Sequence, residues 1–348
     1  MKKSAAENNK SNTKSVLVTG GAGYVGSHTV VELLSQGYRV VVLDNLSNSS
    51  IETIDKIRRL TESDFAFHHS DLNDADLLRR ILIEDKIDGV IHFAALKAVE
   101  ESCEEPLPYY EVNVSQSLKL IQAMENEKVF NFVFSSSACV YNEIVSGRVA
   151  ENSSSNQQNN PYGRSKRMVE EILYDLSNSD PRWCIANLRY FNPIGAHSSG
   201  TIGDDPRGVP QNLMPYLMSV GSGNRASLNV FGNDYDTNDG TGVRDYIHVV
   251  DVAKSHIQAF EGIRSHKGFT SWNVGTGKGY SVLEVVAAFE KVTGINIPVN
   301  IVDRRSGDVA HSVADTSKIA RDLAWRAKFS LEDMIRDAWN YECKRSPQ

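Results

Sequence analysis

The chain has no long apolar run. No segment of its 348 residues approaches the roughly 18 consecutive apolar residues of a membrane-spanning helix, so the sequence does not support a transmembrane span. Residues 1–14 are polar and lack the apolar core of a signal peptide, and we expect them to form a disordered tail. Together these features favour a cytoplasmic protein without a membrane partner.

Cysteine is scarce, and the charge balance is only mildly acidic. The cysteines are widely scattered and form no C-x-x-C pair, which argues against a disulfide framework and a metal site and predicts four free thiols, at Cys103, Cys139, Cys184 and Cys343. The net charge of -7 gives no general attraction to nucleic acid, which is therefore not an expected partner. A local basic patch could still hold a dianionic small molecule.

Short apolar strands alternate with helical stretches through the first half of the chain. Segments such as 40–43 have lost the polar alternation of a half-exposed strand, as central strands of a parallel sheet do. The pattern predicts an α/β fold with a Rossmann-type, doubly wound parallel sheet, whose ligands bind at the carboxyl ends of the strands. The expected strands are 15–19, 38–44, 65–70, 89–94, 131–136 and 185–190.

The composition changes after Asn192 to segments rich in Gly, Pro, Asn and Asp, which predicts a smaller, irregular α/β substrate-binding lobe. Segments 246–250 and 271–274 look like returns into the sheet, and Ser281 with Glu284 forms a capping-box pattern that begins a helix. The lobes are therefore interleaved. The expected NAD-binding domain is 15–192 with return segments at about 243–277, and the expected substrate lobe is 193–242 with 278–348.

A glycine-rich turn follows the first expected strand. Gly20, Gly23 and Gly26 are spaced by three, so that backbone N–H groups at the start of the next helix can face a pyrophosphate. Asp44 follows Gly26 by 18 residues at the end of the second strand, where a carboxylate accepts from an adenosine ribose and repels a 2′-phosphate. This predicts NAD rather than NADP, with Asp71 near the adenine. The alternative is a tight turn followed by a strand-end Asp with a capping role.

A candidate catalytic set lies further along the chain. Tyr162 and Lys166 share one face if their segment is helical. A Tyr hydroxyl ionises at about pH 10, and a nearby ammonium together with an oxidised nicotinamide lowers that value, so Tyr162 is a candidate general base. Ser137, at a strand end, can donate to the substrate oxygen. Beside a nicotinamide, this set predicts hydride transfer. Alternatively, the three are a half-buried anchor, a solvated lysine and a polar strand end.

From about Ser15 to its end the chain resembles the UDP-galactose (UDP-glucose) 4-epimerases, a family of extended short-chain dehydrogenases/reductases. The resemblance implies a tightly bound NAD that is regenerated in each cycle, a UDP-hexose substrate and a homodimer. It rests on Gly20-Gly21-Ala22-Gly23-Tyr24-Val25-Gly26, on Tyr162-Gly163-Arg164-Ser165-Lys166, and on further matches at 43–46, 92–99, 134–137, 188–193, 212–215 and 242–249.

The resemblance also implies a reaction. Tyr162 takes the proton of the sugar 4-hydroxyl as hydride moves from C4 to the nicotinamide, which gives a 4-keto sugar and NADH. The ketone then rotates and receives the hydride on its other face, so that C4 is inverted. Lys166 tunes Tyr162 and binds the nicotinamide ribose, and Ser137 polarises the sugar oxygen.

Binding roles follow from the same resemblance. Arg244 and Arg305 neutralise the diphosphate, for which planar guanidinium groups are suited, and Asp308 accepts from the uridine ribose. The implied cofactor positions are Gly20, Gly23, Tyr24, Val25, Gly26, Asp44, Asn45, Asp71, Leu72, Phe93, Ala94, Ala95, Lys97, Asn113 and Tyr190. The implied substrate positions are Ser137, Tyr162, Phe191, Asn192, Asn212, Leu213, Phe231, Arg244, Arg305, Asp308 and Ser312.

Several positions depart from the family pattern or vary within it. Glu100 replaces a usual small residue, Asn142 replaces a usual glycine, and the loop 151–160 is unusually rich in Ser, Asn and Gln. Ser312, four residues after Asp308, is small where the family has either a bulky aromatic or a small side chain. Because a small residue leaves room beside the sugar 2-position, it predicts that UDP-N-acetylglucosamine and UDP-N-acetylgalactosamine are also substrates.

Other functions stay open beside this one. Another nucleotide-sugar epimerase would share these features. A nucleotide-sugar dehydratase needs an additional acid/base pair, typically just after the strand-end Ser or Thr, whereas Ala138 and Cys139 follow Ser137 here. A non-catalytic NAD-sensing protein on the same fold should have lost Tyr162 or Lys166, and both are present.

Overall fold

The computed structural model of the chain describes residues 13–141, 147–153, 160–206, 210, 212–305 and 308–345. The predicted tail 1–14 and the loop 151–160 therefore lie largely outside the described residues, as does Asn142. The four cysteines all lie within the described ranges and are free, as predicted. None of the helices in these ranges combines the length and the apolar character that a bilayer crossing requires.

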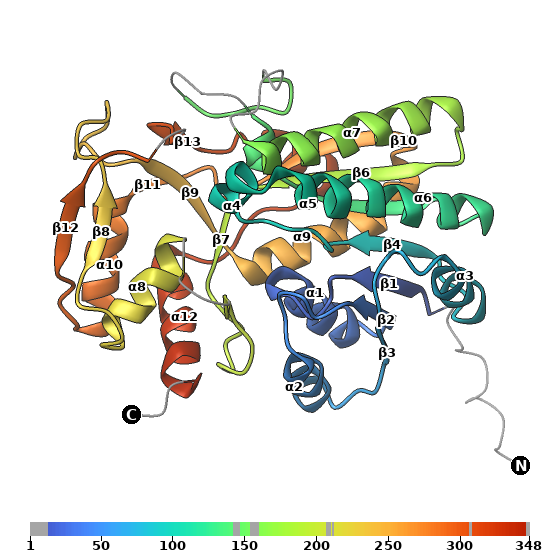
Figure 1. Ribbon diagram of the computed structural model, residues 1–348, viewed down its shortest axis with the longest axis horizontal. Helices are drawn as coiled ribbons and strands as arrows, with labels where there is room; N and C mark the ends of the chain where they lie inside the picture. The colour runs from blue at the N-terminus through green and yellow to red at the C-terminus, as the bar shows by residue number, and fades with distance from the viewer. Residues whose placement is uncertain are drawn as a thin grey trace, which may run out of the picture.

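A seven-stranded parallel sheet forms the centre of the first lobe and confirms the predicted fold class (Figure 1). Its order is β10-β6-β5-β4-β1-β2-β3, so the direction of winding reverses between β1 and β4. Ligands of doubly wound sheets bind at this reversal, outside the carboxyl ends of the strands. The strands are β1 (Ser15–Thr19), β2 (Arg39–Asp44), β3 (Ala66–His69), β4 (Gly89–His92), β5 (Asn131–Ser137), β6 (Cys184–Tyr190) and β10 (Gly268–Val274).

Helices cover both faces of this sheet. Because strand side chains alternate between faces, Val16 packs in the same core as Val30 of one helix layer, whereas Leu17 packs with Leu78 of the other. One layer contains α1 (Tyr24–Ser35), α2 (Ile51–Thr61) and α9 (Val249–Gly262). The other contains α3 (Ala75–Glu84), α6 (Gln116–Asn126) and α7 (Pro161–Ser179).

Short helical segments follow two of the central strands at their carboxyl ends. After β4 come α4 (Val99–Glu104), α5 (Pro106–Tyr110) and a π-helical turn, Glu111–Ser115, that leads into α6. After β5 comes a 3₁₀ turn, Ala138–Val140. These segments place side chains beside the crevice where the winding reverses.

Within the described residues, the second lobe contains two small sheets and three helices (Figure 1). Its core includes Met214, Val285, Phe289 and Ile335. One sheet contains β7 (Asn192–Ile194), β9 (Val243–His248), β11 (Gly279–Ser281) and β13 (His311–Ser312), and the other pairs β8 (Leu228–Phe231) with β12 (Val299–Val302). The helices are α8 (Leu213–Gly221), α10 (Val282–Thr293) and α12 (Leu331–Arg345).

The capping box that the sequence predicts at Ser281 and Glu284 is confirmed. The Ser281 hydroxyl accepts from the Glu284 N–H at 3.0 Å, and the Glu284 carboxylate accepts from the Ser281 N–H at 2.8 Å. This reciprocal capping box starts α10 where the sequence predicted it.

The prediction that 246–250 returns to the large sheet was wrong, whereas 271–274 does lie in it as part of β10. β9 pairs instead with β7, β11 and β13, and α9 begins at Val249. The His248 ring accepts from the Val250 N–H at 3.0 Å and caps that helix. Further on, α11 (Ser317–Leu323) packs against α9 and β10, with Ile319 in the core of the first lobe. The predicted domain boundaries stay a prediction.

Candidate functional site

The glycine turn after β1 has the geometry of a phosphate-binding turn. Gly20 has φ +70°, and a Cβ there would lie 2.6 Å from the Ala94 backbone nitrogen. At Gly26 a Cβ would collide with the Gly20 carbonyl oxygen. Among the described residues, no side chain caps α1 at Gly23, and its first turn contains no acidic residue. The free N–H groups at this helix start therefore suit an anionic pyrophosphate.

Asp44, at the end of β2, holds this turn. Its carboxylate accepts from the N–H groups of Ala22 and Leu46 and from the Ser49 hydroxyl, each at 2.9 Å. Next to it, the Asn45 side-chain amide donates to Asp71 at 2.9 Å. The second strand thus ends in fixed polar groups beside the turn, as binding of an adenosine would require.

A cavity of about 260 Å³ runs from this turn to the predicted catalytic pair. Its wall contains both Tyr162 and Lys166. The predicted cofactor residues that line it are Gly20, Gly23, Tyr24, Val25, Gly26, Asp44, Phe93, Ala95, Lys97 and Tyr190. The glycine turn, the strand-end carboxylate and the Tyr–Lys pair therefore share one continuous space, which fits an extended dinucleotide.

The remaining predicted cofactor residues lie behind this wall or beside it. Leu72 is buried in the core of the first lobe, and Ala94 packs against that core. Asn113, on the π-helical turn, accepts from the Leu96 N–H at 2.8 Å and donates to the Ser165 hydroxyl at 2.9 Å. It joins the loop after β4 to α7, so it supports the site from behind.

Sequence reasoning missed part of the wall. Residues 201–206 and Tyr341 of α12 line the cavity, as do 47–50, Glu52, Thr53 and Lys56. The residues just before the first of these segments are held by α12, where Asn340 donates to the Ser198 carbonyl at 3.0 Å and Lys344 donates to the Ser199 carbonyl at 2.6 Å. No local motif marks such contacts.

Helix α7 carries the predicted catalytic pair on one face, as the spacing indicated. The Asn160 side chain caps the helix by accepting from the Gly163 N–H at 2.8 Å, and Pro161 occupies the first helical position. Lys166 is buried and donates to the Ser135 carbonyl at 2.9 Å, with its ammonium 4.9 Å from the centre of the Phe134 ring.

Burial dominates the electrostatics of this pair. It lowers the pKa of Lys166 to about 7, against the opposing charge of Glu170. It also raises the pKa of Tyr162 well above its usual range, with the charge of Tyr190 adding to the effect and a hydrogen bond with Ser137 opposing it. The sequence predicted a lowered Tyr162 pKa in the presence of both Lys166 and an oxidised nicotinamide, and that lowering stays a prediction.

A buried ion pair lies one turn further along α7. Glu170 and Arg189 of β6 are joined through Arg189 nitrogens at 2.9 and 2.6 Å, and the side chains are 1% and 4% exposed. Glu170 also accepts from the Ser136 hydroxyl at 2.6 Å and from the Asn187 amide at 2.8 Å. Since Ser136 lies between Ser135 and Ser137, this network fixes the strand end beside the predicted catalytic groups.

The predicted diphosphate and uridine residues gather in the second lobe. The Arg305 guanidinium carbon lies 3.8 Å from the centre of the Phe231 ring. Arg244 donates to the Val309 carbonyl at 2.7 Å and pairs with Asp308 at 3.4 Å. Ser312 of β13 is in register with Arg244 of β9. The structure thus brings Phe231, Arg244, Arg305, Asp308 and Ser312 to one region.

Other predicted substrate residues flank the carboxyl end of β6 and the start of α8. Phe191 is buried in a small cluster with Val140 and Val149, while Asn192 is exposed and begins β7. Asn212 precedes α8 at its N-cap position, and Leu213 packs against the core of the second lobe. Cys139, two residues after Ser137, interacts electrostatically with Arg244 and Asp308, so the predicted catalytic and diphosphate residues lie near one another.

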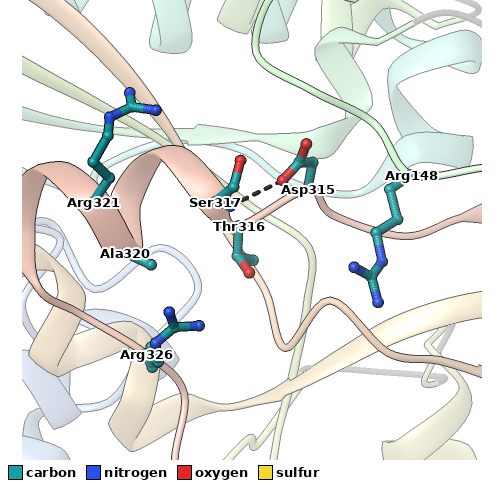
Figure 2. Close-up of a pocket in the computed structure, with 7 residues that line it drawn as sticks. All are labelled: Arg148, Asp315, Thr316, Ser317, Ala320, Arg321 and Arg326. Carbon is teal, nitrogen blue, oxygen red and sulfur yellow. Dashed lines mark hydrogen bonds between the residues drawn. The ribbon is translucent and has the colours of Figure 1, made fainter.

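A second hollow, of about 310 Å³, lies beside α11. Figure 2 shows Arg148, Arg321 and Arg326 around it, with the Asp315 carboxylate accepting from the Ser317 N–H at 2.9 Å. Its described lining includes no predicted catalytic or binding residue. The candidate active site is therefore the cavity that contains Tyr162 and Lys166.

Comparisons with known proteins show which family the chain belongs to. The family model for GDP-mannose 4,6 dehydratase matches residues 17–338. UDP-glucose 4-epimerase of Bacillus subtilis is 51% identical over 327 residues, which cover 94% of this chain and 96% of that protein.

The UDP-glucose 4-epimerase from Stenotrophomonas maltophila, solved with bound NAD and formylated UDP-arabinopyranose, has a TM-score of 0.93 and 47% identity, with 95% of this chain and 98% of that chain covered. The UDP-Glc/GlcNAc 4-epimerase from Campylobacter jejuni has a TM-score of 0.83 and 37% identity, with 95% and 99% covered. The chain therefore belongs to the UDP-glucose 4-epimerase family, among the extended short-chain dehydrogenases/reductases.

Proposed function

We propose that this protein is an NAD-dependent epimerase that inverts C4 of UDP-galactose and UDP-glucose in galactose metabolism. The observation that carries the proposal is the single cavity that joins the uncapped start of α1 to Tyr162 and Lys166. The close relatives named UDP-glucose 4-epimerase, and the neighbour that holds NAD with a UDP-sugar, support the same activity.

The cofactor site follows from the cavity wall. The N–H groups at the start of α1 bind the pyrophosphate, and Asp44 accepts from the adenosine ribose. When bound, NAD accepts the hydride from C4 of the sugar and returns it. Asn45 and Asp71 lie beside the adenosine end, while Asn113 holds the loop after β4 in place from behind.

The catalytic groups of the chain handle the proton. Tyr162 takes the proton of the 4-hydroxyl and later returns it, with Ser137 donating to the same sugar oxygen. Because burial raises the pKa of Tyr162, its phenolate needs a positive charge nearby. Lys166 supplies that charge when protonated. Its hydrogen bond to the Ser135 carbonyl holds the ammonium beside the carboxyl end of β5.

The second lobe holds the nucleotide. Arg244 and Arg305 bind the diphosphate, Asp308 accepts from the uridine ribose, and Phe231 orients the Arg305 guanidinium. Asn192 and Asn212 with Phe191 and Leu213 complete the sugar and phosphate surroundings. Because these groups bind parts of the substrate other than C4, they affect mainly the affinity of the enzyme for its substrate and not the rate of the reaction at C4.

A dehydratase is the competing enzyme class, and the family model that matches residues 17–338 carries a dehydratase name. Elimination of water requires an acid/base group beside the strand-end serine. Ala138 and Cys139 occupy those positions, and burial raises the pKa of the Cys139 thiol, which keeps it protonated at neutral pH. A non-catalytic NAD-binding role is disfavoured because Tyr162 and Lys166 are both present and share the cavity.

The proposal extends to N-acetylated sugars. Ser312 lies in register with Arg244, close to the diphosphate region, and its side chain is small. A small residue there leaves room for an acetamido group at C2. The Campylobacter jejuni enzyme, described as acting on both UDP-Glc and UDP-GlcNAc, supports this breadth within the family.

We further propose a homodimer in the cytoplasm. Large apolar side chains are exposed on α5, α6 and α7, where an isologous contact would bury them. The four free thiols fit a reducing compartment. The exposed apolar residues of these helices are Leu107, Leu118, Met168 and Tyr174.

The decisive experiment incubates the purified protein, without added NAD, with UDP-galactose and UDP-N-acetylgalactosamine and separates the products chromatographically. Conversion of both sugars supports the full proposal, including retained NAD. Conversion of UDP-galactose alone rejects the Ser312 inference. Conversion of neither, even after NAD is supplied, rejects the epimerase itself.

A further inference from the structure

An ion pair spans the two lobes beside the diphosphate region. Glu100 lies on α4, which follows β4 at the carboxyl edge of the large sheet, and α4 borders the smaller lobe in Figure 1. Its carboxylate lies 3.7 Å from the Arg305 Nε. Arg305 follows β12 of the other lobe. A side chain of the first lobe therefore already contacts a cation that the proposed function assigns to the substrate.

This contact is loose. Charge-assisted hydrogen bonds of a guanidinium to a carboxylate are typically about 2.7–2.9 Å long, and the Glu100–Arg305 separation of 3.7 Å exceeds that range. The Glu100 and Arg305 side chains are 54% and 33% exposed, so water screens their attraction. The Arg305 guanidinium carbon lies 3.8 Å from the centre of the Phe231 ring, so the ring, and not Glu100 alone, holds the guanidinium in place. A diphosphate can therefore replace the carboxylate at little cost.

The local charge opposes an incoming anion. Helix α4 also carries Glu101 and Glu104 and has no basic residue along its six positions. Glu101 accepts from the Tyr109 hydroxyl at 2.8 Å and is held away from the cation. Glu100 is the acid of this helix that reaches Arg305, so a diphosphate seated on Arg305 must either displace its carboxylate or lie beside a like charge.

We propose that Glu100 competes with the substrate diphosphate for Arg305 and so lowers the affinity of the enzyme for UDP-sugars. The inference rests on the proposed function, because it assumes that a diphosphate binds at Arg305. This competition affects binding of the nucleotide part and not the reaction at C4, so it weakens the binding of substrate and of product equally. Turnover at saturation is then unaffected by it, and release of the product is eased.

The test compares the NAD-loaded wild type with Glu100→Gln and with the matched control Glu104→Gln, which removes the same charge from an exposed position on the same helix. Affinity for UDP is measured by titration calorimetry at low salt, and kcat and KM are measured with UDP-galactose. Glu100→Gln is expected to bind UDP about two- to five-fold more tightly, the range of an exposed charge pair, and to lower KM with kcat unchanged. Glu104→Gln is expected to match the wild type.

Several outcomes would overturn the inference. Unchanged or weaker UDP binding by Glu100→Gln would show that the carboxylate does not compete, and weaker binding would assign it instead to holding Arg305 in place. An equal gain in Glu104→Gln would reduce the effect to the net charge of α4. A wild-type protein that neither binds UDP nor converts UDP-galactose would reject the proposed function itself, and with it the proposed competition of Glu100 for Arg305.

Discussion

Replacement of Glu170 by Gln tests whether the buried pair beneath the active site holds the catalytic strand end in place. The wild-type carboxylate accepts from the guanidinium groups of Arg189 and Arg167, from the Ser136 hydroxyl and from the Asn187 amide. Gln keeps the shape but removes the charge and replaces one acceptor oxygen with a donor. Arg189 then remains as a buried cation without its carboxylate. One of the groups that donate to the carboxylate must also move, because it would face the new NH2 group, which is itself a donor.

The structure sets the size of the effect. Breaking a buried pair by neutralising one partner costs about 3–5 kcal/mol, because the remaining charge stays desolvated. Glu171, the next residue, pairs with Arg167 at 3.1 Å but is 61% exposed. Glu171→Gln is therefore a matched control and should cost less than about 1 kcal/mol. The two neighbouring substitutions thus differ severalfold in their expected effect on the free energy of unfolding.

The assay is urea unfolding of the NAD-loaded protein at pH 7, followed by the same comparison in acid. Burial raises the pKa of Glu170, but the hydrogen bonds and charge of Arg189 outweigh it, so the folded-state pKa lies below its usual value. A lowered carboxyl pKa contributes stability that is present above the unfolded value of about 4.3 and is lost as the pH falls through the folded value. The stabilities of the wild type and Glu170→Gln should therefore converge in acid.

Activity provides an independent readout of the same variant. Lys166 has a pKa of about 7, and the negative charge of Glu170 raises that pKa. Glu170→Gln should therefore lower the pKa of Lys166 and move the matching step in the pH dependence of kcat/KM to lower pH. Equal stabilities of Glu170→Gln and Glu171→Gln at pH 7, with an unchanged pH profile, would refute the reasoning.

Three further substitutions test other parts of the proposal. Tyr162→Phe should lower kcat by about 10²–10⁴ while bound NAD, measured by release on denaturation, is retained; unaltered turnover would contradict the proposed base. Gly26→Ala should abolish NAD retention, because its Cβ would collide with the Gly20 carbonyl oxygen, and normal cofactor content would contradict the phosphate-turn assignment. Leu107→Glu, at a position that is 78% exposed on α5, should shift the protein from dimer to monomer in light scattering, whereas Ile301→Glu on β12 should not; identical masses would reject this dimer face.

The sequence predicted the large sheet and the placement of Tyr162 and Lys166 on one helix because both leave local patterns. Strands buried on two faces become continuous apolar runs, and Tyr162 with Lys166 has the spacing of one helical turn. The same pattern misassigned 246–250, because an apolar run shows burial but not the identity of the neighbouring strand. Only the pairing of β9 with β7, β11 and β13 places it in the smaller sheet.

The missed cavity wall has a different cause. Residues 201–206 line the cavity, and α12 holds the start of that loop through Asn340 and Lys344, more than a hundred positions along the chain. The contacts end on the carbonyls of Ser198 and Ser199, and a backbone acceptor is present at every residue regardless of its side chain. Contacts of this kind have no sequence signature, so only the fold reveals them.

Asp44 shows how a residue that the sequence predicts for one role can have a second role that the sequence does not indicate. The motif identified Asp44 as a ribose acceptor, whereas the structure shows its carboxylate accepting from the chain's own Ala22, Leu46 and Ser49. An ionised carboxylate has about four acceptor positions, so three internal donors leave room for a ribose hydroxyl. One side chain thus both shapes the phosphate-binding turn and faces the cavity, which couples the fold of that turn to recognition of the cofactor.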